Sequence, residues 1–129
     1  MGKKHSPLFL RRVEHSRMII NECTIEEFSS MLSDTRSLIV IDVREAHEFE
    51  SGHMQGATHI GKGVLERDIE KHPFGTNDRI VLYCGGGFRS AIAAQSLQEM
   101  GFENVFSLWG GWRSIVAKGL EITTINSSD

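Results

Sequence analysis

Two continuous apolar runs, Leu38–Ile41 and Ile80–Tyr83, constrain the fold of this chain more than any other feature. Neither run shows the polar alternation of a half-exposed strand, which is the pattern expected where helices cover both faces of a parallel sheet. Segments of helical period separate these runs from weaker strand candidates at 18–20, 57–60 and 104–108. The alternation predicts an α/β domain with a mostly parallel five-stranded sheet flanked by helices.

Helix start and stop signals fill the intervals between the expected strands. Thr24 and Glu27 form a capping-box sequence that predicts a helix beginning there. A second helix is expected after residue 88 and ends at Gly101, a residue that readily adopts the left-handed terminating conformation. Shorter helices are expected over 64–71 and over 112–118, the latter followed by Gly119.

The size and charge of the chain limit its organisation and its partners. Its 129 residues fit one domain, which we expect over residues 18–122, between an N-terminal extension over 1–17 and a C-terminal tail over 123–129. The net charge of -3 offers no positive field for nucleic acid or an acidic membrane surface. The longest apolar run, Ile80–Cys84, has five residues and is too short to span a membrane. Two cysteines are too few for a disulfide scaffold, so we expect a reducing, cytoplasmic setting.

The segment that carries chemistry begins where the second apolar run ends. Cys84 follows that run, three consecutive glycines over 85–87 follow Cys84, and a helix then opens with Phe88, Arg89 and Ser90. The carboxyl ends of parallel strands are the edge where ligands bind in open α/β sheets. Glycines let successive N–H groups point inward as an anion-binding nest, and the helix adds its positive dipole end. This arrangement favours a thiolate at Cys84, whereas an isolated buried cysteine would be inert.

Other polar residues have structural explanations that compete with functional ones. Asp42 and Arg44 follow the first apolar run. We expect them to support the site, Asp42 by accepting backbone hydrogen bonds and Arg44 by pairing with a carboxylate such as Glu48. His47, His53 and His59 do not have the spacing of a zinc site, so no metal and no other cofactor is expected. Cys23 is expected to be an inert buried thiol, and Trp109 and Trp112 either line the crevice or pack in the core.

Several ordered motifs resemble those of single-domain rhodanese-like sulfurtransferases. The run Cys84-Gly85-Gly86-Gly87-Phe88-Arg89-Ser90 is similar to the Cys-x-x-Gly-x-Arg-Ser loop of that family. Upstream, the runs over 41–45 and 52–57 resemble its Asp-Val-Arg-Glu and Gly-His-Ile-x-Gly-Ala elements, and 108–112 resembles its closing Gly-Gly element. The resemblance covers residues 19–122 and implies a three-layer rhodanese-like fold.

The resemblance also implies a two-step reaction. Cys84 would attack the sulfane sulfur of a donor such as thiosulfate or a persulfide, carry that sulfur as a persulfide, and release it to a thiol, cyanide or protein thiol acceptor. The N–H groups of residues 85–90 would bind the anionic sulfur, making Gly85, Gly86, Gly87, Phe88 and Ser90 the substrate-binding residues. Arg89 would either attract the incoming anion or hold the loop through a carboxylate.

Two other functions compete with sulfur transfer. A rhodanese-like module can act as a sulfur carrier, sensor or protein-binding domain without turnover, although non-catalytic relatives often lack the cysteine that this chain retains. Cysteine-dependent phosphatases resemble Cys-x5-Arg, whereas only four residues separate Cys84 from Arg89, and the shorter loop suits a sulfur atom better than a phosphoryl group. The three neutral glycines after Cys84 also differ from the basic residues of the large two-domain rhodaneses, which leaves the donor open.

Overall fold

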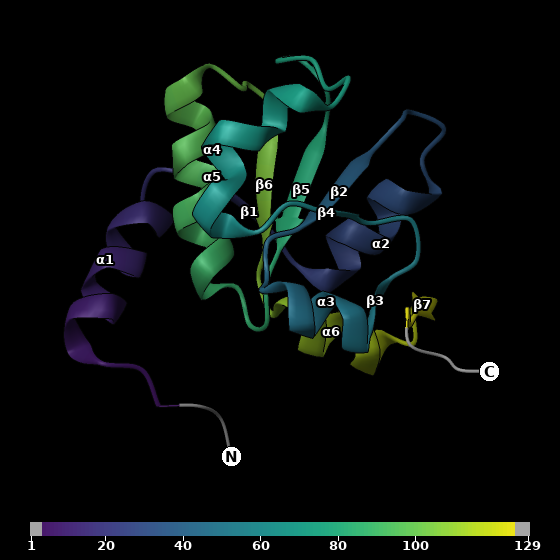
Figure 1. The fold of residues 1–129 in the computed structure, drawn as a ribbon, viewed down its shortest axis with the longest axis horizontal. Coiled ribbons are helices and arrows are strands. Elements are labelled where there is room, and N and C mark those ends of the chain that lie inside the picture. Colours follow the sequence, from purple (N-terminus) through teal and green to yellow (C-terminus); the bar gives the residue numbers. More distant parts are fainter. Residues whose placement is uncertain (1–3, 126–129) are drawn as a thin grey trace.

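The computed structural model describes residues 4–125 and has a five-stranded sheet between two layers of helices (Figure 1). Its strand order is β1-β6-β5-β2-β4, and every neighbouring pair in this sheet is parallel. A separate antiparallel pair joins β3 to β7. The predicted α/β class and five-stranded parallel sheet are therefore confirmed.

The strands are β1 (Asn21–Cys23), β2 (Ile39–Asp42), β3 (His53–Met54), β4 (Thr58–His59), β5 (Ile80–Tyr83), β6 (Val105–Leu108) and β7 (Ile122–Thr123). The α-helices are α1 (Pro7–Arg17), α2 (Ile25–Ser33), α3 (Ala46–Ser51), α4 (Leu65–Asp68), α5 (Phe88–Met100) and α6 (Gly111–Lys118). Two 3₁₀ turns, Lys62–Val64 and Ile69–Lys71, flank α4.

Side chains of the central strand β5 alternate between two cores, one on each face of the sheet. Ile80, Leu82 and the following Cys84 face the core covered by α1, α4 and α5, while Val81 and Tyr83 face the core covered by α2 and α6. All four β5 residues are fully buried. The continuous apolar run thus reflects a strand covered on both faces, and it delivers Cys84 to the carboxyl edge of the sheet.

Several expected elements have the predicted start and stop chemistry. Thr24 and Glu27 form the reciprocal capping box of α2, with hydrogen bonds of 2.8 and 3.1 Å. Gly101 and Gly119 end α5 and α6 in the left-handed conformation. The helix expected over 64–71 is instead a four-residue α-helix between two 3₁₀ turns.

The strand expected over 18–20 was wrong. The N–H groups of Ile19 and Ile20 donate to the carbonyl of Ser16 and close the end of α1, so the strand begins only at Asn21. Helix α1 lies in the segment expected to be an extension, and it begins at Pro7 with Ser6 as its N-cap residue. Helix α1 packs against α5, and its Val13 and Ser16 are fully buried.

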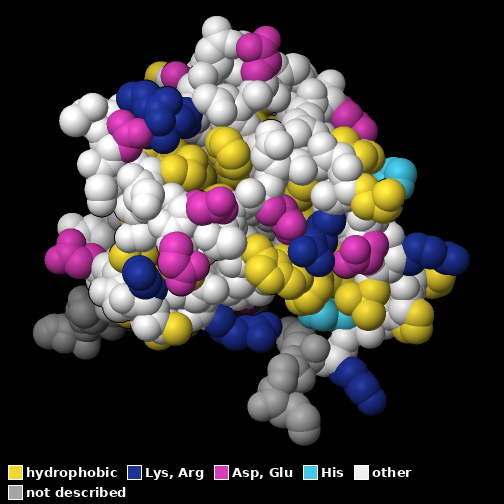
Figure 2. All heavy atoms as spheres, turned by 180° about the vertical axis from the view of Figure 1, so that it is seen from behind, with side chains coloured by type: hydrophobic (Ala, Val, Ile, Leu, Met, Phe, Trp, Pro, Cys, Tyr) yellow, Lys and Arg dark blue, Asp and Glu magenta, His cyan; other side chains and the backbone are white. Residues whose placement is uncertain are grey.

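Charged side chains of both signs are interspersed over the face drawn in Figure 2. No helix in residues 4–125 has the length and apolar character needed to cross a membrane. The face drawn in Figure 2 offers no broad field of one sign to a charged ligand.

Candidate active site

The sulfur of Cys84 lies in a cradle of N–H groups at the start of α5. The backbone N–H groups of Gly87 and Ser90 donate to Cys84 Sγ over 3.2 and 3.3 Å, and Sγ is also within hydrogen-bond distance of Ser90 Oγ at 3.5 Å. Ser90 Oγ is in turn bonded to Ser107 Oγ on β6 at 2.8 Å. Two backbone N–H groups, those of Gly87 and Ser90, therefore point at the sulfur from the loop and the first turn of α5.

Two glycines allow the chain to fold so closely around Cys84. Gly87 has φ +108°, and a Cβ there would lie 3.0 Å from the Trp109 ring and 3.2 Å from the Leu108 carbonyl oxygen. Gly111 also has a positive φ, and its Cβ would collide with the carbonyl oxygen of Cys84. Any other residue at either position would be strained and would push the loop away from its neighbours.

The start of α6 fixes the other side of the loop. The N–H of Trp112 donates to the Cys84 carbonyl over 2.7 Å, and the N–H of Gly110 donates to the Gly86 carbonyl over 3.0 Å. The first N–H groups of a helix have no partner within the helix, so here they satisfy loop carbonyls. The strand β5, the loop and α6 therefore form one hydrogen-bonded unit.

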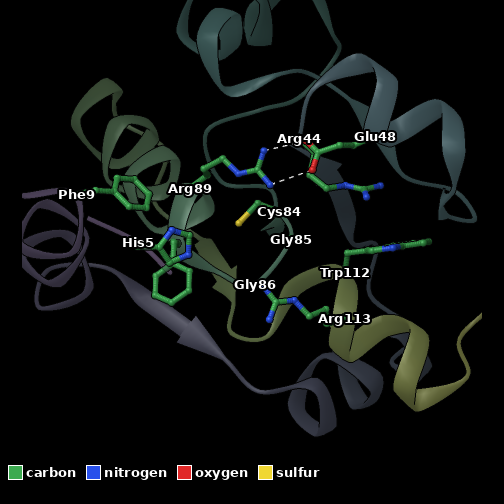
Figure 3. A pocket seen from close by; sticks show the side chains of 11 residues that line it. His5, Phe9, Arg44, Glu48, Cys84, Gly85, Gly86, Arg89, Trp112 and Arg113 are labelled. Atoms are coloured by element: carbon green, nitrogen blue, oxygen red, sulfur yellow. Dashed lines mark hydrogen bonds and ion pairs between the residues drawn. The ribbon is translucent and has the colours of Figure 1, made fainter. Parts of the chain in front are cut away.

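Arg89 forms an ion pair with Glu48 across the site. Arg89 Nη1 lies 2.9 Å from Glu48 Oε1, and Nη2 lies 3.3 Å from Oε2 (Figure 3). The hydrogen bonds from Arg89 lower the pKa of Glu48 from 4.5 to about 2, and the same contact raises the pKa of Arg89. Of the two roles left open for Arg89, the geometry corresponds to holding the loop through a carboxylate.

Asp42 and Arg44 form a buried pair beneath the site. Arg44 donates to both Asp42 oxygens, with the shortest contact at 2.8 Å, and to the Gly52 carbonyl at 2.6 Å. Asp42 accepts the backbone N–H of Arg44 at 2.9 Å, as expected. The expected pairing of Arg44 with Glu48 was wrong, because Asp42 already occupies the Arg44 guanidinium and Glu48 faces Arg89.

Cys84 opens into a cavity of about 500 Å³. Figure 3 shows Cys84 near the middle of this cavity, with Arg89 and Glu48 on one side and Trp112 and Arg113 on another. Gly85, Gly86 and Phe88 also line it, whereas Gly87 and Ser90 act from beneath through their N–H groups. The cavity therefore combines the sulfur, its anion cradle and three guanidinium groups, those of Arg44, Arg89 and Arg113.

The remaining candidates lie in structural positions. His53 Nδ1 and His59 Nε2 are each 2.8 Å from a backbone carbonyl oxygen. Residues 4–125 contain no group of three or more His, Cys, Asp or Glu side chains arranged to hold a metal ion. Trp112 lines the Cys84 cavity, while Trp109 is stacked under the Arg17 guanidinium at 3.8 Å. Cys23 is buried, and burial raises the pKa of its thiol to about 12.

Four residues that shape the cavity were not expected there from the sequence. Arg113 follows the Gly-Gly turn, and Glu48 had been assigned to the wrong arginine. His5 and Phe9 come from the segment expected to be an extension. The available signal for that segment was Ser6-Pro7, a typical helix start, followed by Phe9 and Val13 at helical spacing.

Comparisons with known proteins identify the family of this chain. A family model for the rhodanese-like domain matches residues 24–118. The "Putative sulfur carrier protein YrkF" of Bacillus subtilis is 34% identical over 85% of this chain and 60% of its own length, so this chain spans less than two thirds of that relative. The thiosulfate sulfurtransferase GlpE of Coxiella burnetii is 33% identical over 61% of this chain and 72% of its own length.

A solved structure supports the fold independently. The rhodanese-like domain of an Anabaena protein, determined by NMR, superposes with a TM-score of 0.73 over 84% of this chain and 83% of that domain, at 23% identity. The family model covers most of the chain, including β5, the Cys84 loop and α6. This chain therefore belongs to the rhodanese-like domain family.

Proposed function

We propose that this protein is a sulfurtransferase that carries a sulfane sulfur on Cys84. The observation that supports this most directly is the pair of N–H donors aimed at Cys84 Sγ, from Gly87 and Ser90. A thiolate and a persulfide are both anionic, so the same cradle stabilises the nucleophile and the intermediate that it forms.

With thiosulfate as donor, the Cys84 thiolate attacks the outer sulfur. The bond between the two thiosulfate sulfurs breaks, and sulfite leaves with the electron pair, which leaves a persulfide anion on Cys84. In the second step a thiolate, cyanide or protein thiol attacks the terminal sulfur of that persulfide. The new bond forms on the acceptor, the persulfide S–S bond breaks, and the Cys84 thiolate is regenerated.

The arginines have different roles in this proposal. Arg89 holds the loop against α3 through Glu48, and Arg44 supports the floor of the site through Asp42. Arg113 makes no ion pair with a carboxylate within residues 4–125, and it lies beside Gly86 at the cavity wall. Arg113 is therefore the cation available to a donor or acceptor anion.

The proposal keeps the cytoplasmic setting expected from the sequence, since free cysteines such as Cys23 and Cys84 are typical of proteins in reducing compartments. It assigns no cofactor, since the thiolate and the donor together supply every bond that forms and breaks. A small sulfur-containing anion or a persulfide is the donor.

Mass spectrometry of the intact protein after incubation with thiosulfate or polysulfide tests this function. We expect one added sulfur on Cys84, no addition in Cys84→Ser, and normal addition in the matched variant Cys23→Ser. Steady-state transfer to cyanide or a thiol acceptor should disappear only in Cys84→Ser. Cys23 is a suitable control because its raised pKa, about 12, keeps it protonated.

Each contrary result points to a different function. Sulfur addition at Cys84 without turnover would replace the enzyme with a sulfur carrier or sensor. An unmodified Cys84 with every sulfane donor would exclude both. Hydrolysis of an aryl phosphate that vanishes in Cys84→Ser would instead identify a phosphatase.

A further inference from the structure

Part of the Cys84 cavity is built from outside the region that matches the rhodanese-like family model. The model match begins at residue 24, whereas His5 and Phe9 line the cavity. His5 directly precedes the N-cap of α1, and Phe9 lies in its first turn. The N-terminal segment therefore contributes side chains to the site in addition to those of the matched domain.

Helix α1 is held firmly in the position that brings these residues to the cavity. Val13 and Ser16 are fully buried, and Ser16 Oγ donates to Gln95 Oε1 on α5 over 2.7 Å. Arg12 Nη1 adds hydrogen bonds of 2.6 Å to Ser16 Oγ and 3.2 Å to Gln95 Oε1. The bond between Ser16 and Gln95 is buried, so these two side chains would lose a partner at a cost in free energy if the helix moved away.

His5, Phe9 and Phe88 form an aromatic wall on one side of Cys84. The His5 ring centroid lies 4.5 Å from that of Phe88 and 5.3 Å from that of Phe9, and all three rings line the cavity. In Figure 3 the labelled His5 and Phe9 stand on the side of Cys84 away from Trp112. The space above the sulfur thus lies between aromatic groups, with Arg113 also at its edge.

The cavity is larger than an inorganic donor requires. Thiosulfate has five heavy atoms and, at about 30 Å³ for each water-sized group, occupies roughly 150 Å³. The cavity measures about 500 Å³, a size typical of sites for organic ligands. Thiosulfate would therefore reach Cys84 without filling the space beside the aromatic wall.

We propose that the aromatic wall makes this site selective for sulfane donors in which the anionic sulfur is attached to an apolar group of aromatic size. This inference rests on the proposed sulfurtransferase function and specifies its substrate class. The anionic end of such a donor lies near Arg113 and the N–H groups of the loop, while its apolar body packs against His5, Phe9 and Phe88. Burial of that body then contributes to binding and to the rate of sulfur transfer.

An organic thiosulfonate serves as the probe because its transfer step balances in the same way as that of thiosulfate. The Cys84 thiolate attacks the terminal sulfur of R–SO₂–S⁻, and the bond between the two sulfurs breaks. The sulfinate R–SO₂⁻ leaves with the electron pair, and Cys84 retains the persulfide anion. Benzenethiosulfonate and methanethiosulfonate carry the same reacting group and differ in the apolar body attached to it, and comparing the native protein with variants of the wall removes the intrinsic difference between their sulfinate leaving groups.

The test compares kcat/KM for these two donors. We expect benzenethiosulfonate to be about tenfold better, which corresponds to roughly 55 Å² of additional apolar surface removed from water. The variant His5→Ala/Phe9→Ala should lose most of this preference, so that its kcat/KM values for the two donors become nearly equal. Leu8→Ala is the matched control, because Leu8 lies on the same helix, is 70% exposed and does not line the cavity. Equal kcat/KM values for the two donors in the native protein would overturn the inference.

Two further measurements separate this inference from folding and from the proposed function. Phe9 packs against the hydrophobic core, and His5→Ala alone leaves that contact intact. This single variant should reduce the preference for benzenethiosulfonate over methanethiosulfonate to half or less. Benzenesulfonate has no sulfur to transfer, and it should slow alkylation of Cys84 by iodoacetamide more than methanesulfonate does. If this protection occurs but no donor is turned over, the proposed function fails and the binding preference stands. If all donors are used and the protection is equal, only the binding preference fails.

Discussion

Replacing Glu48 with glutamine tests whether Arg89 holds the active-site loop or is available to bind a substrate anion. Glutamine keeps the shape of the side chain and can still accept the hydrogen bond that Glu48 receives from the Glu45 N–H at 2.9 Å. The substitution therefore removes mainly the charge that faces Arg89. If the ion pair holds the loop, the variant loses stability and gains no affinity for anions.

The expected loss of stability in Glu48→Gln can be calculated from the shift in the pKa of Glu48. Its pKa falls from 4.5 to about 2, and the first cause is the hydrogen bonding from Arg89. This shift corresponds to about 3 kcal/mol of interaction at neutral pH. The two side chains are 32% and 29% exposed, so solvent screening reduces the effect. We expect Glu48→Gln to lower the free energy of unfolding by about 1–2 kcal/mol at pH 7.

The pH dependence of this loss has a definite sign. A depressed folded-state pKa stabilises the protein above the unfolded pKa, here 4.5, and the contribution disappears as pH falls toward about 2. The difference between the native protein and Glu48→Gln should therefore be constant above pH 6. It should shrink to roughly half or less by pH 3.

Urea unfolding at pH 7, 5, 4 and 3 measures this difference directly. Glu50→Gln is the matched control, since Glu50 is an exposed carboxylate on the same helix without an ion pair among the described residues. Thiosulfate kinetics at pH 7 provide the second readout, in which KM should not decrease. A stability change below about 0.3 kcal/mol together with a lower KM would refute the anchoring role and show that Arg89 binds the donor.

Three further substitutions test other parts of the site. Arg113→Gln should raise KM for thiosulfate about fivefold at low salt and weaken the salt dependence of KM, because a cation at the cavity is lost. In the same kinetic assay, Lys118→Gln on the same helix should change neither KM nor its salt dependence. Asp42→Asn should lower the free energy of unfolding by about 3 kcal/mol in urea, since it removes the charge that compensates a buried guanidinium. Gly87→Ala should cost about 2–4 kcal/mol in urea unfolding through its positive φ and its crowded Cβ position. Gly56→Ala, with a positive φ but open space around it, should cost about 1 kcal/mol.

The parts of the fold that could be predicted are those in which local sequence and tertiary packing agree. Ile80–Tyr83 reads as a buried strand because both of its faces are covered, and Thr24 reads as a helix start because its cap is satisfied locally. Strand β1 was misplaced because it is a short stretch at the sheet edge, defined by pairing with β6 and carrying polar residues. Its position depends on a partner more than 80 residues away in sequence, which a local pattern does not contain.

The same distinction applies to the active site, where contacts within one segment of the sequence could be predicted and contacts between distant segments could not. The cradle of Cys84 could be predicted because strand, glycines and helix start are contiguous in sequence. The partner of Arg89 could not, since Glu48 lies 41 residues away on α3 and competes with Asp42 for the neighbouring arginines. The same limit applied to His5 and Phe9, whose place at the cavity depends on the packing of α1 against α5.

These long-range contacts bear on the proposed sulfur transfer, because they determine how much positive charge three arginines present to the cavity. Glu48 and Asp42 neutralise two of the guanidinium groups and fix them in the wall and floor. Within residues 4–125, an incoming anion therefore meets one cavity guanidinium without a carboxylate partner, that of Arg113, and the backbone N–H groups of the loop. A strongly positive cavity would attract any small anion, phosphate included. The N–H groups of Gly87 and Ser90 instead both donate to a single atom, Cys84 Sγ, which is the atom that becomes part of the persulfide in the proposed reaction. In the proposed donor preference, discrimination then depends on the size and apolar character of the group attached to the donor sulfur, for which the cavity of about 500 Å³ has space.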